Sequence, residues 1–504
     1  MPILNSIFSW WMKKRIHQIE LFTKYPLEVQ QEWFHELIKT AQNTEWGKKY
    51  AYAEIEKESS FKARVPIQNY EDIKPYVDRM MQGEQNLLWP SDIRWFAKSS
   101  GTTNNRSKFI PVSREALEEC HYKGGKDMLS IYCAAHEETE VFTGRTLMMG
   151  GSSQTIDPSN DSYHGDLSSI IIKNLPFWAE IRRTPDRETA LLENFEDKLK
   201  KMTKICAEEN VTSLSGVPSW MLVLLNKILE NQKKTDISEI WPNLEVFFHG
   251  GVAFTPYREQ FKAIISSPKM NYLETYNASE GFFGIEDPDH PGELLLMLDY
   301  GIYYEFIPME EWNQEHPKTL GLDEVELDTN YALLISTNAG LWRYKIGDTI
   351  QFTSLYPFRL KVSGRTKHFI NAFGEEIIID NAEQALKAAC EKTGALIEEY
   401  TAAPVHLTNH EAGKHQWLIE FNRPPSNPKD FIQALDDHLR EINSDYDAKR
   451  KGDMALEIPE LIVLPEETFY RWMKSRNKLG GQNKVPRLSN DRKYVEDILR
   501  FTSS

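Results

Sequence analysis

Residues 244–281, LEVFFHGGVAFTPYREQFKAIISSPKMNYLETYNASEG, read as a strand, a helix and a second strand. The apolar run at 244–248 stops at Gly250-Gly251, which predicts a buried strand. A helix is expected over residues 256–265, and a strand near Tyr272 follows it. Because a helix between two strands typically connects parallel neighbours, this stretch predicts one βαβ unit of a parallel or mixed sheet.

The same alternation of helix and strand precedes this stretch. Apolar residues at helical spacing predict one helix over residues 186–206, a short strand at 211–214 and a second helix over 218–229. Repeated units of this length predict an α/β fold in which helices cover a mixed or parallel sheet.

From residue 294 onward the pattern changes to strands with few helices. The clearest strands are expected at 294–298, 303–307, 331–337 and 359–362. They indicate a β-rich subdomain within one large N-terminal domain, for which we predict residues 1–364. The segment Ser363-Gly364-Arg365 is the expected boundary.

A smaller α/β domain is predicted over residues 365–504. Its helices are expected at 381–390 and 428–442, and its strands near Val405, at 417–421 and at 461–464. A short linker joins it to the large domain, so we expect a mobile lid.

Composition and charge exclude several classes of protein. The 504 residues suggest roughly two to four domains, and 59 Lys+Arg against 75 Asp+Glu give a formal net charge of −16. That acidic balance disfavours a protein that coats nucleic acid or an anionic membrane. Basic residues are nonetheless concentrated in segments 98–114, 343–367 and 473–492. An anionic small molecule therefore remains a possible ligand.

Cysteine usage and hydropathy bear on the compartment. Cys120, Cys133, Cys206 and Cys390 lie far apart without a C-x-x-C pair, so neither a disulfide framework nor a structural zinc site is expected. Neither a signal peptide nor an apolar run of about 18 residues is found. We therefore expect a cytoplasmic protein with no membrane, nucleic-acid or obligate protein partner.

The densest chemical signal is residues 98–108, KSSGTTNNRSK, between expected strands at 93–97 and 109–110. Hydroxyls, a flexible glycine and lysines suit a loop that surrounds phosphate oxygens with hydrogen-bond donors. It is not a Walker A loop, because G-x-x-x-x-G-K-[ST] is absent. A polar surface hairpin is the alternative interpretation.

Three further segments have residue types suited to a nucleotide. In residues 274–281, ETYNASEG, a ring can cover a purine and a carboxylate can hold Mg²⁺. In 342–348, WRYKIGD, the aspartate at a strand end can accept from ribose hydroxyls, and in 480–487, GGQNKVPR, a lysine can act from a loop. The plainer alternatives are a core Tyr276, a solvated Glu280, a turn-capping Asp348 and a frayed basic tail.

The order and spacing of these four segments resemble the acyl-adenylate-forming enzymes. Within that superfamily the chain resembles a bacterial-type member of the auxin-responsive acyl-acid amido synthetase family. The family's S-S-G-T-[ST] loop with a following lysine is matched by residues 99–103 and Lys108. Its Y-x-x-S-E motif is matched by residues 276–280, and its Y-[RK]-x-G-D motif by residues 344–348.

The hinge segment of the superfamily is also recognisable. It is matched here by Arg365, Ile370, Gly374, Glu375, Ile377 and Glu383. The chain departs from the pattern twice: Asn104-Asn105 occupies the place of the second loop glycine, and residues 366–369 contain no aspartate.

The resemblance implies a role for each matched residue. Phosphates of ATP would be held by Ser99, Ser100, Gly101, Thr102, Thr103 and Lys108, and the adenine by Thr275, Tyr276, Asn277 and Ser279. Asp348 would fix the ribose, and Arg365 and Lys367 would complete the nucleotide-binding set. Glu280 would hold Mg²⁺. The catalytic residues would be Lys484, Glu280 and Lys108, with Lys484 neutralising charge on the α-phosphate and the carboxylate.

The implied activity is that of an ATP-dependent ligase with small-molecule substrates. It would adenylate a carboxylic acid and pass the acyl group to an amine, with an amino acid as the expected acceptor. The acid would lie between the helix at 116–132 and the loops near Gly150-Gly151 and 217–220. Two alternatives stay open: an acyl-CoA synthetase-like ligase that forms a thioester, and a non-catalytic nucleotide- or acyl-acid-binding protein on the same fold.

Overall fold

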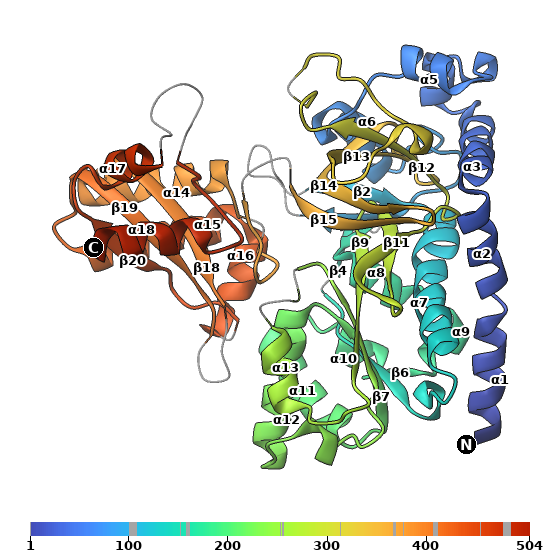
Figure 1. Cartoon of the computed structure of the whole chain (residues 1–504), viewed down its shortest axis with the longest axis horizontal. Helices are drawn as coiled ribbons and strands as arrows, with labels where there is room; N and C mark the ends of the chain where they lie inside the picture. The colour runs from blue at the N-terminus through green and yellow to red at the C-terminus, as the bar shows by residue number, and fades with distance from the viewer. Residues whose placement is uncertain are drawn as a thin grey trace.

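A mixed sheet forms the centre of the large N-terminal part of the chain (Figure 1). The computed structural model describes residues 2–99, 108–151, 153–157, 162–252, 254, 257–312, 314–365, 369–375, 377–406, 412–453, 455–476 and 485–503. Among these residues the strand order is β12-β13-β14-β15-β11-β10-β9-β8-β7-β3-β6. The strands are β3 Arg145–Met148, β6 Arg183–Thr184, β7 Val211–Gly216, β8 Val246–Gly250, β9 Asn271–Ala278, β10 Gly281–Asp287, β11 His290–Leu296, β12 Ile302–Pro308, β13 Asn330–Thr337, β14 Tyr344–Leu355 and β15 Phe358–Arg365.

The parallel half of this sheet confirms the predicted βαβ pattern. Strands β6, β3, β7, β8 and β9 pair in parallel, and the remaining neighbours pair antiparallel. Helices α12 (Pro218–Gln232) and α13 (Arg258–Ile264) form the crossovers from β7 to β8 and from β8 to β9. The antiparallel half is the predicted β-rich subdomain.

One predicted helix is divided in two. Instead of a single helix over residues 186–206, the chain forms α10 (Arg187–Ala190) and α11 (Phe195–Ala207). The Asn194 side chain accepts a hydrogen bond from the Asp197 amide at 3.0 Å and so caps α11. A side-chain cap of this kind starts a new helix, and the apolar spacing on either side of it did not reveal the break.

The full length of strand β14, Tyr344–Leu355, was not expected from the sequence. Its apolar alternation is interrupted where the register with β15 shifts, between Thr349 and Ile350 and again between Phe352 and Ser354. Gly347 takes a positive φ of 101°. Asp348 therefore lies inside a long strand, and the prediction of a strand end there is wrong.

A second, smaller sheet lies beside the first, in the order β2-β1-β5-β4. Its strands are β1 Trp95–Ser99, β2 Lys108–Val112, β4 Ser153–Asp157 and β5 Ser162–Gly165. The predicted pair of strands around the phosphate loop is thereby confirmed, because β1 and β2 are antiparallel neighbours.

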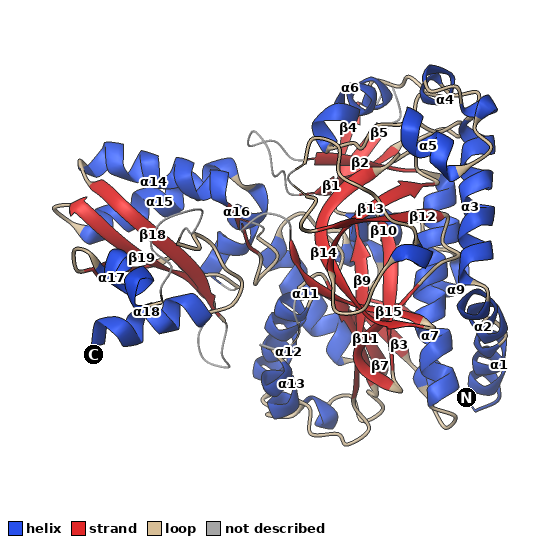
Figure 2. Cartoon of the chain, turned by 45° about the horizontal axis from the view of Figure 1, so that its top comes forward, coloured by secondary structure: helices blue, strands red, loops and turns tan. Residues whose placement is uncertain are grey.

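Helices surround these sheets, and those near the N-terminus run along one side of the molecule (Figure 2). The helices of the N-terminal part that have not been named so far are α1 Pro2–Lys13, α2 Ile16–Lys24, α3 Pro26–Ala41, α4 Glu45–Lys49, α5 Glu58–Arg64, α6 Tyr70–Met81, α7 Tyr122–Ala135, α8 Leu167–Lys173 and α9 Phe177–Glu180. A π-helical turn, Ala116–His121, leads into α7. No described helix is long and apolar enough to cross a membrane.

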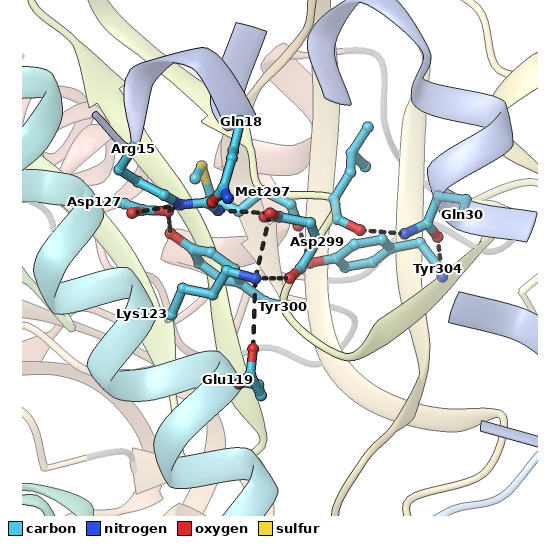
Figure 3. Close-up of polar contacts among 11 residues, drawn as sticks. Arg15, Gln18, Gln30, Glu119, Lys123, Asp127, Met297, Asp299, Tyr300 and Tyr304 are labelled. Atoms are coloured by element: carbon cyan, nitrogen blue, oxygen red, sulfur yellow. Dashed lines mark hydrogen bonds and ion pairs between the residues drawn. The ribbon is translucent and has the colours of Figure 1, made fainter. Parts of the chain in front are cut away.

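A buried ion network attaches the N-terminal helices to α7 and to the loop before β12 (Figure 3). Arg15 lies 2.9 Å from Asp127 and 2.6 Å from Asp299, with the Asp127 side chain fully buried. The Tyr300 hydroxyl donates to Asp127 at 2.8 Å, and Lys123 donates to the Asp299 carbonyl at 2.7 Å. Burial raises the pKa of Asp127 above its usual range, and the Arg15 hydrogen bond opposes that rise.

The C-terminal part is a smaller α/β unit, as predicted. Its sheet has the order β18-β19-β20, and a short β16–β17 pair precedes it. The elements are β16 Phe369–Ile370, β17 Ile377–Ile378, α14 Ile379–Thr393, β18 Leu396–Val405, β19 Lys414–Arg423, α15 Pro428–Ile442, α16 Ser444–Arg450, β20 Glu460–Leu464, α17 Thr468–Ser475 and α18 Lys493–Ser503. The Tyr257 hydroxyl donates to the Ala372 carbonyl at 2.5 Å and so links the two parts. The domain boundary at residues 364/365 stays a prediction.

Two acidic residues, Glu274 and Glu286, lie close together on the neighbouring strands β9 and β10. Glu286 accepts from the amides of Glu274 at 2.6 Å and Gly292 at 2.7 Å. Burial raises the pKa of Glu274 to about 7, the Glu286 charge adds to the rise, and Arg258 opposes it. Glu274 is therefore the member of the pair that holds a proton below neutral pH.

The Arg15 network predicts a large cost for breaking it. Arg15→Met leaves Asp127 buried without its cation, so we expect the free energy of unfolding to fall by about 3–5 kcal/mol. Arg79, whose partners Glu45 and Glu84 are 45% and 50% exposed, provides the matched control. Arg79→Met should cost much less than Arg15→Met, because solvent screens an exposed ion pair. Equal losses in urea unfolding would contradict the assigned role of Arg15.

Glu274 predicts a pH dependence of stability. The folded protein holds a proton on Glu274 up to about pH 7, whereas the unfolded chain releases it near 4.5. The contribution of this group to stability is therefore full below the unfolded pKa and is lost as the pH rises through the folded pKa. Glu274→Gln should remove up to about 3 kcal/mol of that decline. Unfolding curves between pH 5 and pH 8 measure it, with exposed Glu259→Gln as the control, and an unchanged slope in Glu274→Gln would refute the assignment.

Candidate active site

Strands β1 and β2 bring the two ends of the predicted phosphate loop together. Ser99 and Lys108 are register partners in the antiparallel pair, so residues 100–107 connect adjacent positions of neighbouring strands. The Tyr70 hydroxyl accepts from the Phe109 amide at 2.8 Å and fixes the start of β2 against α6. The predicted phosphate ligands Ser100, Gly101, Thr102 and Thr103 lie outside the described residues.

The predicted adenine motif forms a β-hairpin. Ala278 pairs with Gly281, so Ser279 and Glu280 occupy the turn between β9 and β10. Thr275, earlier on β9, donates its hydroxyl to the His249 carbonyl on β8 at 3.1 Å. A Cβ at Gly250 would lie 2.3 Å from the Thr275 carbonyl oxygen, so this close approach of β8 and β9 requires glycine.

The adenine and ribose motifs are joined by a hydrogen bond. The Tyr276 hydroxyl donates to Asp348 Oδ2 at 2.7 Å, and both side chains are buried. In the β14–β15 ladder Asp348 pairs with Arg365, another predicted nucleotide-binding residue. Three predicted site residues that are up to 89 positions apart in the sequence are thus neighbours in space.

This hydrogen bond requires a strongly curved sheet. In the strand order β15, β11 and β10 lie between β14 and β9, which corresponds to roughly 19 Å in a flat sheet. Register shifts between Phe282 and Gly284 on β10 and between Thr349 and Ile350 on β14 interrupt the ladders. Because β-bulges bend and twist strands, they allow the antiparallel half to curl until Tyr276 and Asp348 meet.

A buried arginine fixes the start of β14. The Arg343 guanidinium makes two hydrogen bonds of 2.9 Å to the Glu305 carboxylate on β12 and one of 2.7 Å to the Val65 carbonyl. Arg343 has a φ of 44°, an uncommon value outside glycine. The sequence analysis found Arg343 only as part of a motif and missed Glu305, because nothing in the local pattern pairs residues 38 positions apart.

Tyr344 is a buried residue near both the turn that contains Glu280 and the start of β2. Burial raises the pKa of its hydroxyl well above the usual range, and the charges of Glu280 and Tyr70 act in the same direction. Tyr70 in turn binds the amide of Phe109, the residue after Lys108. The Glu280 turn and the start of β2 therefore approach the same buried side chain.

The donors present suit a magnesium nucleotide. No group of three or more His, Cys, Asp or Glu that could hold a metal occurs among the residues that the structure describes. Mg²⁺ is commonly bound through one or two carboxylates together with substrate phosphates, which is compatible with a turn carboxylate such as Glu280. A lysine at the end of the predicted phosphate loop complements anionic phosphates, and a buried aspartate next to the hairpin can accept hydrogen bonds from ribose hydroxyls.

The structure describes only some of the remaining residues of interest. Lys367 and Lys484 lie outside the described residues, and so does the Arg365 side chain. Phe283 is fully buried and packs against Tyr276 at 4.9 Å between ring centroids, so it is a core residue. Trp220 lies 4.3 Å from the Lys449 ammonium of the C-terminal part.

One residue that the sequence analysis missed is His121, at the end of the π-helical turn. It is 5% exposed, and burial lowers its pKa to about 4. A side-chain hydrogen bond with Asn277 of the hairpin opposes that lowering of the pKa. The only signal in the sequence was its position inside an apolar helix, where a satisfied core histidine is equally expected.

Comparison with known families extends over most of the chain. The GH3 family N-terminal domain matches residues 15–270, the GH3 family central domain matches 295–365 and the GH3 family C-terminal domain matches 380–493. A jasmonoyl–L-amino acid synthetase of Nicotiana attenuata is 22% identical, covering 94% of this chain and 92% of that protein.

Solved structures show the same fold. An acyl acid amido synthetase in complex with 2,4-DB superimposes with a TM-score of 0.63 at 17% identity and covers 98% of this chain and 96% of that chain. A 2-hydroxyisobutyryl-CoA ligase superimposes with a TM-score of 0.56 at 11% identity over 95% of this chain and 92% of that chain. Both support the predicted α/β architecture with a large N-terminal and a smaller C-terminal part.

The three family models follow one another along the chain and together cover most of it. This chain belongs to the GH3 family.

Proposed function

We propose that this protein is an ATP-dependent acyl-acid amido synthetase. It activates a carboxylic acid as an acyl-adenylate and transfers the acyl group to an amine, with an amino acid as the acceptor. The observation that carries the proposal is the Tyr276–Asp348 hydrogen bond, which joins an aromatic residue suited to adenine and a carboxylate suited to ribose. The GH3 family membership and the amino-acid-conjugating relative support the choice of acceptor.

The first step forms a mixed anhydride. A carboxylate oxygen of the acid attacks the α-phosphorus of ATP, and pyrophosphate leaves with the electron pair of the broken P–O bond. Ser99, Lys108 and the hydroxyls of Ser100, Thr102 and Thr103 would hold the departing phosphates, and Lys484 would offset the charge that develops at the α-phosphate. Glu280 would hold a Mg²⁺ ion, which would supply positive charge near the phosphates. Positioning and charge stabilisation suffice for this step, and no covalent enzyme intermediate is needed.

The second step forms the amide. The amine attacks the acyl carbonyl, AMP leaves with the anhydride oxygen, and the nitrogen loses a proton. On the nucleotide side, Thr275, Tyr276, Asn277 and Ser279 line the adenine, Asp348 accepts from the ribose, and Arg365 with Lys367 completes the set. Opening of the C-terminal part between the steps would admit the amine while water stays excluded during adenylation.

The second candidate is a thioester-forming ligase. It is favoured by the shared fold with a 2-hydroxyisobutyryl-CoA ligase, which shows architecture alone. Both candidates release pyrophosphate when given the right acid, and only the second step separates them. A non-catalytic binding protein on the same fold would release none.

The decisive experiment is a screen of carboxylic acids crossed with amino acids and CoA. Acid-dependent pyrophosphate release should appear for a subset of acids, and amino acids but not CoA should convert the adenylate to product, identified by mass spectrometry. Consumption by CoA alone would establish the thioester ligase. Absence of release across the panel, with ATP still bound, would leave the non-catalytic protein.

Asp348 predicts a loss of nucleotide affinity. Asp348→Asn removes a charge-assisted acceptor, worth about 1.5–3 kcal/mol, so ATP should bind roughly 10- to 100-fold more weakly. Tyr276→Phe keeps the ring and should weaken binding only a few-fold. Asp289→Asn, on an exposed turn of the same sheet, is the control. Calorimetry measures all three, and an unchanged Asp348→Asn affinity would count against the ribose role.

The proposed role of Lys484 predicts that its removal slows adenylation without weakening ATP binding. Lys484→Ala should slow acid-dependent pyrophosphate release roughly 100- to 1000-fold, because a charge that stabilises the transition state is removed. ATP affinity should change little. Lys474→Ala, on the exposed face of α17, is the matched control. Undiminished release in Lys484→Ala would remove this lysine from the adenylation step.

A further inference from the structure

Helix α16 brings two charged side chains to the side of the C-terminal part that faces the N-terminal part (Figure 1). The Lys449 ammonium lies 4.3 Å from the ring centroid of Trp220 on α12. Asp445 is four residues earlier on α16 and therefore on the same face of the helix. The charges of Asp166 and Lys98, both in the N-terminal part, act on the pKa of Asp445. Charged groups from both parts thus meet at this junction.

Neither Lys449 nor Asp445 has a direct polar partner. Within the described residues, the Lys449 ammonium and the Asp445 carboxylate form no hydrogen bond or ion pair, either with each other or with a neighbour. By contrast, the adjacent Arg450 pairs with Asp436 at 2.7 Å, as buried charges usually do. Burial lowers the pKa of Lys449 and raises that of Asp445, yet both residues stay partly exposed. A small molecule can therefore reach both charges.

Other charged groups of the junction are already held by the fold. The Lys198 ammonium donates to the Gly150 carbonyl at 2.7 Å. Glu375 lies 2.7 Å from His415 Nε2 and accepts from backbone amides of its own segment. The Asp166 carboxylate lies against Gly151, where a Cβ would collide with it. Lys198 and Glu375 therefore do not compete for the charges on α16.

The junction borders the region predicted for the acid. The acid is expected near Gly150-Gly151 and residues 217–220, and the junction includes both, through Asp166 and Trp220. Lys98, on its other side, precedes Ser99, where the predicted phosphate loop begins. A molecule bound to α16 at this junction would therefore lie beside the activated acid, where the acceptor of the second step has to be.

The two charges restrict what can bind. An ammonium and a carboxylate on one helix face complement a molecule that carries a carboxylate and an ammonium of its own. A free α-amino acid carries both. A phosphate group of ATP or CoA would be repelled by Asp445 and Asp166. An amine without a carboxylate would leave Lys449 without an anion.

We propose that Lys449 binds the α-carboxylate of the acceptor amino acid and that Asp445 binds its α-ammonium group. The inference rests on the proposed amide-forming function and locates the binding site of its second substrate. An ammonium has three donors, so Lys449 can bind a carboxylate while it stays on the face of the Trp220 ring.

The test pairs each acceptor amino acid found in the screen with its α-carboxamide, for example L-alanine with L-alaninamide. The carboxamide keeps the amine and the side chain but lacks the negative charge. Product formation by the full chain is measured by mass spectrometry with an acid that releases pyrophosphate. The amino acid should exceed its carboxamide roughly 10- to 100-fold in kcat/KM, because the carboxamide lacks a charge-assisted hydrogen bond. Lys449→Met should bring this ratio close to one by raising the KM for the amino acid and not that for the acid.

Lys451→Met is the matched control, because it removes the same charge two residues away, where Lys451 is 63% exposed and pairs with Asp447. It should leave the ratio unchanged. Equal use of amino acid and carboxamide by the wild-type protein overturns the inference. An equal loss for both substrates in Lys449→Met also overturns it and leaves Lys449 as a contact between the two parts alone. If Lys449→Met does not fold, Lys449→Gln is interpreted in the same way.

Asp445 should affect both substrates of each pair alike. Asp445→Asn should lower kcat/KM for the amino acid and for its carboxamide by a similar factor, since both carry the α-ammonium group. Unchanged values for both would refute the assigned role of Asp445.

The failure of the proposed function would look different. If no acid releases pyrophosphate, adenylation is refuted, and calorimetry of the twenty amino acids with the full chain then decides the inference alone. Binding that Lys449→Met abolishes would support it, and absence of such binding would overturn it. If CoA alone consumes the adenylate, pyrophosphate release persists while the amide-forming function and the inference are both refuted.

Discussion

The hydrogen bond between Tyr276 and Asp348 can form only if the sheet of the large N-terminal part is strongly curved. The strands that carry these residues are separated by β10, β11 and β15 in the sheet, so their side chains meet only if the sheet curls. Register shifts on β10 and β14 provide the bends. The Arg343–Glu305 pair then fixes the start of β14 against β12. The proposed nucleotide site therefore depends on sheet curvature, and its residues could not be brought together by local structure alone.

The sequence predicted the parts of this arrangement that depend on local pattern. The βαβ unit that ends in β9, helix α15 at Pro428–Ile442 and the paired strands around the phosphate loop follow from apolar spacing and turn residues. The ordered motifs located the hairpin and Asp348 by resemblance. Strand β14 was missed because its bulges break the alternation that identifies a strand. The ion network of Arg15, Asp127 and Asp299 was missed for another reason: its members are up to 284 positions apart, and no local signal pairs them.

The C-terminal part is anchored by a carboxylate of the hinge segment. Glu375 is fully buried, accepts from the amides of Ala372 and Phe373, and lies 2.7 Å from His415 Nε2 on β19. These contacts join Glu375 to the C-terminal sheet. Any rotation of that part would therefore carry Glu375 with it, and the flexible point would lie earlier in the chain.

The pairing of Ser99 with Lys108 has a consequence for how this family can vary. Because the loop leaves and re-enters the sheet at adjacent positions of neighbouring strands, its length and composition can change without shifting the register of β1 and β2. The replacement of a loop glycine by Asn104-Asn105 is a change of this kind. Mutations in the loop leave the buried residues of both strands in place. Selection can therefore change the affinity of the predicted phosphate loop for its ligand without changing the stability of the fold.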